Sequence, residues 1–216
     1  MASDFSISNR GSLREAAMDS GDQLRVALIP ALAPGHMIPL MDIARIFARH
    51  GADVTFITTT GNAPRFRRDV DGDSSAGYKI KLHALQLPSD EVGLPPGIES
   101  FSETTSMEMA GKLSRALGLL ENKIEAFLLE SGVDCIVSDT ILGWTVDAAA
   151  RLGIPRLDFQ CAGSQKEVFF ELPPKGMSSI GMTQEKDDSR MLIFELEASS
   201  KDFSKRNKFR SFVSLA

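Results

Sequence analysis

The chain has 216 residues, of which 43% are hydrophobic and 25% are charged, and its formal net charge is −5. This length suits one large domain or two small ones, and the composition is ordinary for a globular protein. The acidic balance argues against nucleic acid as a partner, because nucleic acids favour basic surfaces. No apolar run has the ~18 residues needed to cross a bilayer, so we expect no stable membrane insertion.

Residues 1–23 are polar and rich in Ser, Asp and Arg, which predicts a disordered N-terminal extension. This stretch lacks the apolar core of a secretory signal, so we expect a cytoplasmic protein. The two cysteines, Cys135 and Cys161, lack metal-ligand spacing. We interpret both as reduced packing residues.

An apolar run over residues 24–30 predicts a buried strand, and helical spacing of apolar residues follows it up to Gly51. Because Pro39 suits only the first turn of a helix, this helix is predicted to begin near residues 36–38. A β-branched stretch over residues 52–60 predicts the second strand.

Residues 67–77 have the composition of a turn, and residues 78–87 are predicted to form a third strand. Residues 88–101 are expected to form a loop around a Pro-Pro-Gly sequence. One long stripe of apolar residues predicts helix over residues 102–131.

A fourth strand is predicted over residues 134–139, a helix over 145–152 and a fifth strand over 154–160. Strands alternate with helices throughout, which predicts an α/β fold with a doubly wound, mostly parallel sheet. The pattern degrades afterwards, so we expect residues 24–160 to form the domain and residues 161–216 to be a divergent, weakly ordered tail.

Open parallel sheets bind ligands beyond the carboxyl ends of their strands, where the strand order reverses. In the common order 3-2-1-4-5, the loop after strand one carries Gly35 and His36, and strand four ends at Asp139. This topology predicts an imidazole beside a carboxylate, which is a base with an orienting acid, and Gly35 would let the backbone approach a ligand. The alternative is structural: a surface histidine and an aspartate that caps the next helix.

Other common site motifs are missing from the sequence. The first strand–helix loop has one glycine where a dinucleotide-binding G-x-G-x-x-G motif needs three, and no Walker A sequence occurs. The three histidines are too scattered for a metal site, so we predict no metal.

Several blocks of the sequence resemble plant family-1 UDP-glycosyltransferases: GHMIPLMDIARIFARHGADVTFITTTGNAPRF, DEVGLPPGIE, and DCIVSDTILGWTVDAAARLGIP followed by RLDFQ. The resemblance implies the GT-B fold, whose N-terminal Rossmann-like domain binds the acceptor and whose C-terminal domain binds the UDP-sugar. Residues 24–160 correspond to the first of these. The implied reaction inverts the anomeric carbon while a sugar, most often glucose, passes from UDP to a small lipophilic alcohol or phenol.

By the same resemblance, His36 corresponds to the general base that deprotonates the acceptor hydroxyl, and Asp139 to the acid that holds it. Phe101, Met107 and Trp144 are candidates to line the acceptor site with Gly35, and core packing is the alternative for these three side chains.

The family's donor box, which begins with Trp and contains His-Cys-Gly-Trp-Asn-Ser, does not occur, since the single Trp is Trp144. We therefore expect a truncated acceptor half that binds no cofactor itself, with a UDP-sugar as co-substrate of the full-length family. The ~55 residues after Cys161 are too few for a second domain. Asp158 also departs from the family, and an unpaired carboxylate in a central strand would be costly.

Two alternatives remain open. In the first alternative, the chain is an inactive truncated paralogue that binds small molecules or associates with an intact transferase, because truncation would expose apolar faces. Otherwise it is a poorly folding remnant with no biochemical role.

Overall fold

The structure is a computed structural model that describes residues 23–162, 165–171 and 181–183. Side chains are described up to residue 159. Residues 1–22 of the predicted extension and most of the predicted tail over 161–216 lie outside the described residues. The domain limits drawn from the sequence therefore stay predictions.

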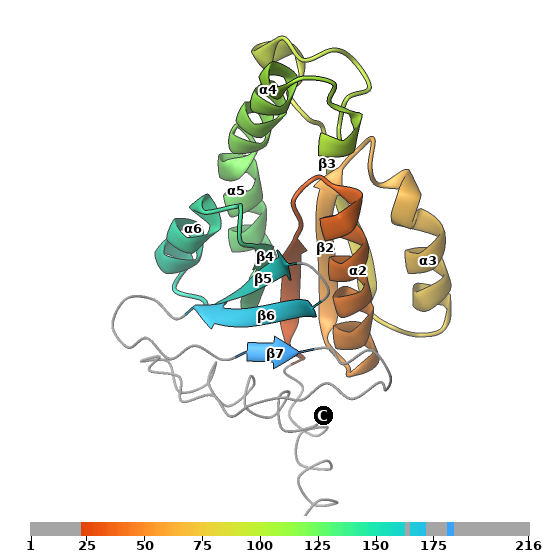
Figure 1. The fold of residues 1–216 in the computed structure, drawn as a ribbon. Helices are drawn as coiled ribbons and strands as arrows, with labels where there is room; N and C mark the ends of the chain where they lie inside the picture. Colours follow the sequence, from red (N-terminus) through yellow and green to blue (C-terminus); the bar gives the residue numbers. More distant parts are fainter. Residues whose placement is uncertain (1–22, 163–164, 172–180, 184–216) are drawn as a thin grey trace, which may run out of the picture.

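In the part of the chain that is described, seven strands form one sheet in the order β3-β2-β1-β4-β5-β6-β7 (Figure 1). The first five strands are parallel, and β6 and β7 are antiparallel additions at one edge. The strands are β1 (Arg25–Ile29), β2 (Asp53–Thr59), β3 (Ile80–Leu85), β4 (Cys135–Asp139), β5 (Arg156–Ala162), β6 (Gln165–Glu171) and β7 (Gly181–Thr183). This confirms the predicted fold class and the order 3-2-1-4-5.

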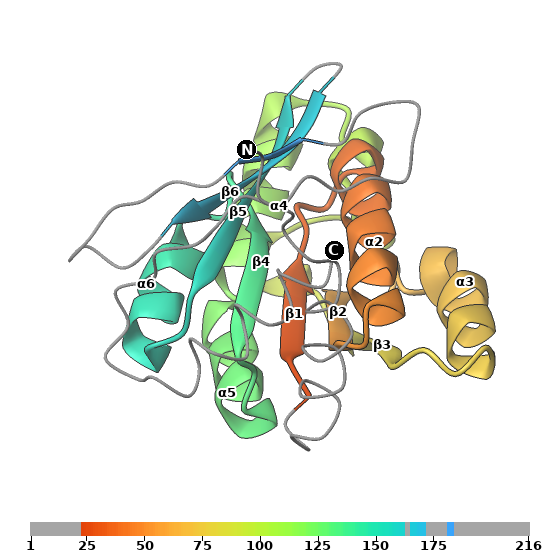
Figure 2. The same cartoon turned by 90° about the horizontal axis from the view of Figure 1, so that it is seen from below.

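Helices cover both faces of the parallel sheet, as a doubly wound fold requires. Helices α2 and α3 lie on one face, and α5 and α6 lie on the other (Figure 2). The helices are α2 (Pro34–Arg49), α3 (Pro64–Ser75), α4 (Met107–Gly118), α5 (Glu121–Ser131) and α6 (Trp144–Leu152), with short 3-10 turns η1 (Asp90–Val92) and η2 (Phe101–Glu103).

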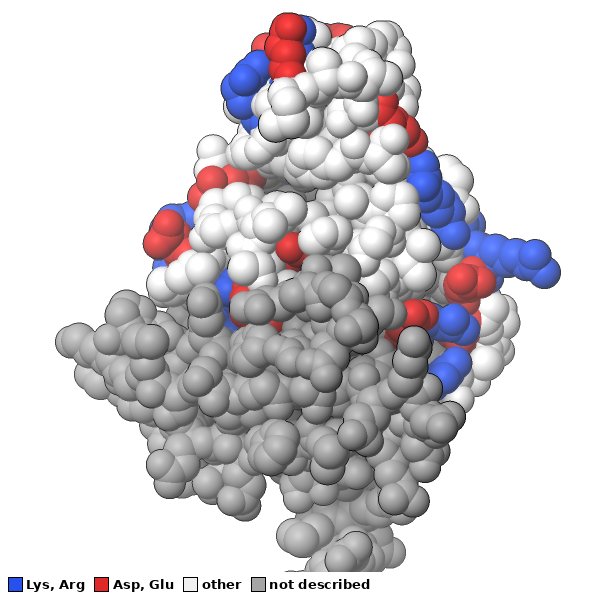
Figure 3. All heavy atoms as spheres, viewed as in Figure 1, with Lys and Arg blue, Asp and Glu red and all other residues white. Residues whose placement is uncertain are grey.

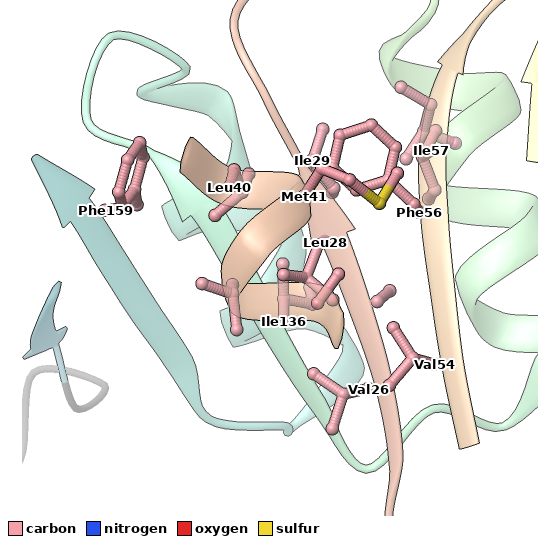
Figure 4. Packing of buried hydrophobic residues seen from close by; sticks show 14 of the residues in the cluster. Val26, Leu28, Ile29, Leu40, Met41, Val54, Phe56, Ile57, Ile136 and Phe159 are labelled. Atoms are coloured by element: carbon pink, nitrogen blue, oxygen red, sulfur yellow. The ribbon is translucent and has the colours of Figure 1, made fainter. Parts of the chain in front are cut away.

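The core lies between the central strands and the helices on each side. Leu40 and Met41 of α2 pack over β1, as Figure 4 shows. Phe56 of β2 is fully buried beside them and tilts against Phe66 of α3, with ring centroids 5.3 Å apart. Central strands buried on both faces are continuously apolar, which explains the RVALI sequence of β1.

Helix α2 begins at Pro34, so the predicted start near residues 36–38 was wrong. Pro34 occupies the first turn, where a missing N–H costs nothing. Pro39 lies inside the helix and is buried. It cannot donate the usual backbone hydrogen bond, and burial of the apolar face of α2 offsets that loss.

The predicted turn over residues 67–77 was also wrong, because helix α3 spans most of it. Phe66 and Val70 lie one turn apart on its buried face, and Asp73 continues that face. The guanidinium of Arg45 on α2 donates two hydrogen bonds to the Asp73 carboxylate. This pairing across 28 residues overrides the local turn composition.

The single helix predicted over residues 102–131 is two helices, α4 and α5, separated at Leu119 and Leu120. Helix α4 begins where the Ser106 hydroxyl accepts a hydrogen bond from the Met109 N–H. Gly118 has a low helix propensity and marks the break. The apolar stripe continues across it, which is why its periodicity suggested one helix.

Candidate active site

The carboxyl ends of β1 and β4 lie side by side at one edge of the sheet. The two strands pair in parallel, with Ile29 opposite Ser138, so the residues after each strand emerge together. Strand order reverses here, because β1 is followed by β2 on one side and β4 joins on the other. This is the edge at which open α/β sheets hold their ligands.

His36 lies in the first turn of α2. Ala33 precedes the helix in an extended conformation, and the His36 N–H donates to the Ala33 carbonyl at 3.0 Å. The side chain is 27% exposed, so its ring reaches the surface while its other edge faces the protein.

Asp139 ends β4, and its side chain is 1% exposed. One carboxylate oxygen, Oδ2, lies 2.5 Å from His36 Nδ1. The other, Oδ1, accepts a hydrogen bond from the Ile141 N–H at 3.2 Å. The two side chains therefore meet within one hydrogen bond, as the topology predicts.

The partner fixes which ring nitrogen of His36 carries the proton. An ionised carboxylate only accepts hydrogen bonds, so Nδ1 is the donor. The remaining nitrogen, Nε2, then presents a lone pair. This arrangement suits a base that removes a proton from a bound hydroxyl, with the carboxylate stabilising the imidazolium that forms.

Gly35 is exposed and adopts ordinary helical backbone angles, since it is not among the glycines with positive φ. Apart from its own helix backbone, a Cβ added there would meet no atom of the described residues within 4 Å. Packing within the described residues therefore does not demand glycine, and the predicted approach of a ligand stays a prediction.

The three predicted acceptor-site side chains differ in their surroundings. Phe101 and Trp144 are partly buried and pack against the core, and their place in the acceptor site stays a prediction. Met107, at the first position of α4, is 87% exposed and is not a core residue. The Phe101 N–H donates to the Leu32 carbonyl at 2.7 Å, which ties the loop before α4 to the loop that leads into α2 and His36.

A second link holds the same loop to the turn that follows β2. The Asn62 amide is buried and donates to the Glu99 carbonyl at 2.8 Å. Ser100 is fully buried and forms a capping box with Glu103 at η2. The loop beside the candidate site is thus fixed from several elements.

The sequence analysis missed the partner of Asp158. This carboxylate is buried in β5, but it accepts a hydrogen bond from the Arg156 guanidinium at 2.7 Å and another from the Thr140 hydroxyl at 2.8 Å. The concern about an unpaired carboxylate was therefore wrong. The alternation of a strand, which places residues 156 and 158 on one face, is the signal that identifies the pair.

His50, His83 and Cys135 lie away from the His36–Asp139 pair and contact helix or core residues. His50 Nδ1 lies 2.9 Å from the Ile46 carbonyl at the end of α2. His83 stacks on Phe127, with ring centroids 3.6 Å apart, and burial lowers the pKa of its imidazole. Cys135 is a free, buried cysteine, and burial raises the pKa of its thiol.

Two further findings concern the described residues only. They contain no group of three or more His, Cys, Asp or Glu side chains placed to hold a metal ion. No helix among them is long and apolar enough to cross a membrane. The predicted cytoplasmic location stays a prediction.

The sequence was compared with protein families and with curated proteins. No protein-family model matches the sequence. Nuatigenin 3-beta-glucosyltransferase of Solanum aculeatissimum is 48% identical over 145 residues, which cover 66% of this chain and 30% of that protein. Soyasapogenol B glucuronide galactosyltransferase of Glycine max is 44% identical over 140 residues, covering 65% of this chain and 28% of that protein. The matched segment thus spans less than a third of these relatives.

Solved structures agree with these relatives. UGT73P12 of Glycyrrhiza uralensis, complexed with glycyrrhetinic acid 3-O-monoglucuronide, has a TM-score of 0.58 and 34% identity, covering 75% of this chain and 36% of that chain. UGT89C1 of Arabidopsis thaliana, complexed with quercetin, has a TM-score of 0.53 and 26% identity, covering 62% and 34%. The same protein has also been solved with UDP. By sequence and by fold, this chain belongs to the plant family-1 UDP-glycosyltransferases.

Proposed function

We propose that residues 24–160 form the acceptor-binding half of an inverting UDP-glycosyltransferase, in which His36 is the general base. The observation that carries this proposal is the 2.5 Å contact between His36 Nδ1 and the buried Asp139 carboxylate. In the neutral imidazole, this contact puts the ring proton on Nδ1 and leaves the lone pair on Nε2, which is the tautomer that a general base needs.

In the proposed reaction, the acceptor hydroxyl donates a hydrogen bond to His36 Nε2. Its proton passes to Nε2 while the oxygen forms a bond to the anomeric carbon of a UDP-sugar. The bond between that carbon and the UDP oxygen breaks, and UDP leaves with the electron pair. Asp139 stabilises the positive charge on the imidazole throughout this step.

The acceptor we propose is a small lipophilic plant metabolite with a hydroxyl group. Two large apolar side chains near the dyad in the chain are exposed, Ile38 at 55% and Ile141 at 61%. In the view of Figure 3, most charged side chains lie at the margins of the described surface, and the area between them is mainly uncharged, with a few acidic atoms within it. Such a surface favours an apolar ligand oriented by a few polar groups.

Transfer of a sugar from UDP requires a second set of groups that binds the UDP-sugar. The relatives named above are about three times longer than the matched segment, and we propose that the donor site lies outside residues 24–160. Placing two reactants together contributes about 7–11 kcal/mol to catalysis. We therefore predict little or no transfer from UDP-glucose by the 216-residue chain alone.

Acceptor binding tests the proposal directly. Quercetin or glycyrrhetinic acid is titrated into the 15N-labelled chain while the ring resonances of its three histidines are followed. We expect saturable shifts of His36 with His50 unchanged, since His50 lies at the far end of α2. A His36→Gln variant should bind more weakly.

The outcomes separate the candidate functions. No binding, or binding that leaves His36 unmoved, contradicts the proposed acceptor site. Robust turnover of UDP-glucose by the isolated chain contradicts the half-enzyme proposal. Binding that persists in His36→Gln with unchanged affinity favours a ligand-binding module without catalysis.

A further inference from the structure

We propose that Arg156 and Asp158 of β5 are positioning residues that fix the end of β4, so that Asp139 holds His36 in its basic tautomer. This inference rests on the proposed function of the dyad. It concerns a buried ion pair that the reaction itself does not use.

Arg156 binds both the end of β4 and the start of α6. Its Nε donates to the Ser138 hydroxyl at 2.7 Å and to the Thr145 hydroxyl at 2.8 Å. Its Nη2 lies 3.4 Å from the backbone carbonyl of Asp139. The side chain is 3% exposed, so these contacts are shielded from water.

Asp158 extends this hydrogen-bond network to Thr140, the residue that follows Asp139. It accepts from Arg156 through Oδ1 and from the Thr140 hydroxyl through Oδ2. The Thr140 N–H also donates to the Phe159 carbonyl at 3.0 Å. The three consecutive residues 138–140 are therefore each held by groups on β5, and Asp139 is the middle one.

The network lies on the opposite face of the sheet from the dyad. Ser138 pairs with Asp158 and Asp139 with Phe159, and successive side chains on a strand point to opposite faces. Arg156 and Asp158 thus share the face on which α6 supplies Thr145, whereas the Asp139 carboxylate contacts His36 of α2. They act on Asp139 through its backbone, by restricting rotation of residue 139.

Stability alone does not account for this pair. Replacing a buried ion pair by well-packed apolar side chains of similar volume is often neutral or stabilising. Charged hydrogen bonds differ from apolar contacts in being directional. Direction matters at Asp139, because its carboxylate must meet one ring nitrogen of His36 while Oδ1 accepts from Ile141.

The test replaces the pair by apolar side chains, Arg156→Met with Asp158→Leu, in the full chain. This double variant should fold, because the hydroxyl groups of Ser138, Thr145 and Thr140 keep other partners. Ser138 and Thr145 hydrogen-bond each other at 2.8 Å, and the Thr140 hydroxyl retains the Phe159 carbonyl at 3.0 Å. Circular dichroism and a cooperative thermal transition verify the fold.

The readout is the tautomer of His36, measured from its ring 15N shifts at about pH 9, where histidine is neutral. We expect the ratio of Nδ1–H to Nε2–H tautomer to fall at least about fivefold in the double variant. His50, whose Nδ1 faces the Ile46 carbonyl, is the internal reference and should not change. Arg151→Met, on exposed α6 surface, is the matched control and should leave His36 unchanged.

An unchanged His36 tautomer in a folded double variant overturns the inference. If the double variant does not fold, Arg156→Lys decides, because lysine keeps the charge but cannot reach Ser138, Thr145 and Asp158 together. It should lower the tautomer ratio, and no change overturns the inference. Asp139→Asn separates the two proposals. If Asp139→Asn leaves the His36 tautomer unchanged, the proposed dyad is wrong. If Asp139→Asn changes the tautomer and the variants at Arg156 and Asp158 do not, only the proposed positioning role is wrong.

Discussion

Substituting Asp139 by Asn changes the dyad by a single group while keeping its size. The Ile141 N–H donates to Oδ1 and continues to require an oxygen there. The new amide therefore places its NH2 at the Oδ2 position, which faces His36 Nδ1. Because an NH2 group only donates, Nδ1 has to accept and Nε2 has to carry the proton.

The size of this effect follows from the two hydrogen bonds. A bond to a charged acceptor contributes about 1.5–3 kcal/mol, which corresponds to a preference of roughly 10- to 150-fold for the Nδ1–H tautomer. A neutral bond in the opposite sense contributes about 1 kcal/mol, or roughly fivefold. Asp139→Asn should therefore shift the tautomer ratio by roughly two to three orders of magnitude.

Ring 15N shifts of His36 at about pH 9 measure this ratio. The same variant should weaken acceptor binding, because Nε2 then presents a donor where the hydroxyl needs an acceptor. A His36 ring that remains Nδ1–H in a folded Asp139→Asn protein would refute the reasoning. Retained acceptor affinity together with an inverted tautomer would show that the hydroxyl does not bind Nε2.

Three further predictions concern stability. Burial lowers the pKa of His83 below its ordinary value of 6.5, so the folded state binds its proton less readily than the unfolded state. Stability is then full above pH 6.5 and falls as the pH drops through that value toward the folded pKa, which urea unfolding at several pH values should show. Arg156→Met alone should cost about 3–5 kcal/mol, because it leaves the buried Asp158 without its guanidinium, whereas Arg151→Met should cost less than about 1 kcal/mol, because its ion pairs are exposed. Phe56→Ala should cost about 3–5 kcal/mol by opening a cavity in a fully buried site.

Each of these predictions has its own control. The pH dependence should be weaker in His83→Gln, and an identical dependence would assign it to other groups. Equal losses for the two arginine variants would contradict the difference in burial. A Leu129→Ala variant, at a side chain 70% exposed, should lose far less than Phe56→Ala.

The sequence pattern was sufficient to predict five strands and the chemistry at their ends, and their order was taken from the common order of doubly wound sheets. A continuous apolar run such as residues 25–29 is buried on both faces, so its local pattern is sufficient to identify it. Once the strands were ordered, a general rule of parallel sheets brought His36 beside Asp139. This step needed no side-chain coordinates, because a sheet's register sets which strand ends meet.

Only the tertiary structure decided the features that depend on partners distant in the chain. Helix α3 forms across a turn-like sequence because its buried face packs on the sheet and Asp73 meets Arg45 of α2. Strands β6 and β7 extend the sheet where the sequence showed no clear period. The partners of Asp158 emerge only once β4 and β5 pair. Local propensities differ by less than the free energy of burying apolar side chains, so long-range packing decides wherever the two conflict.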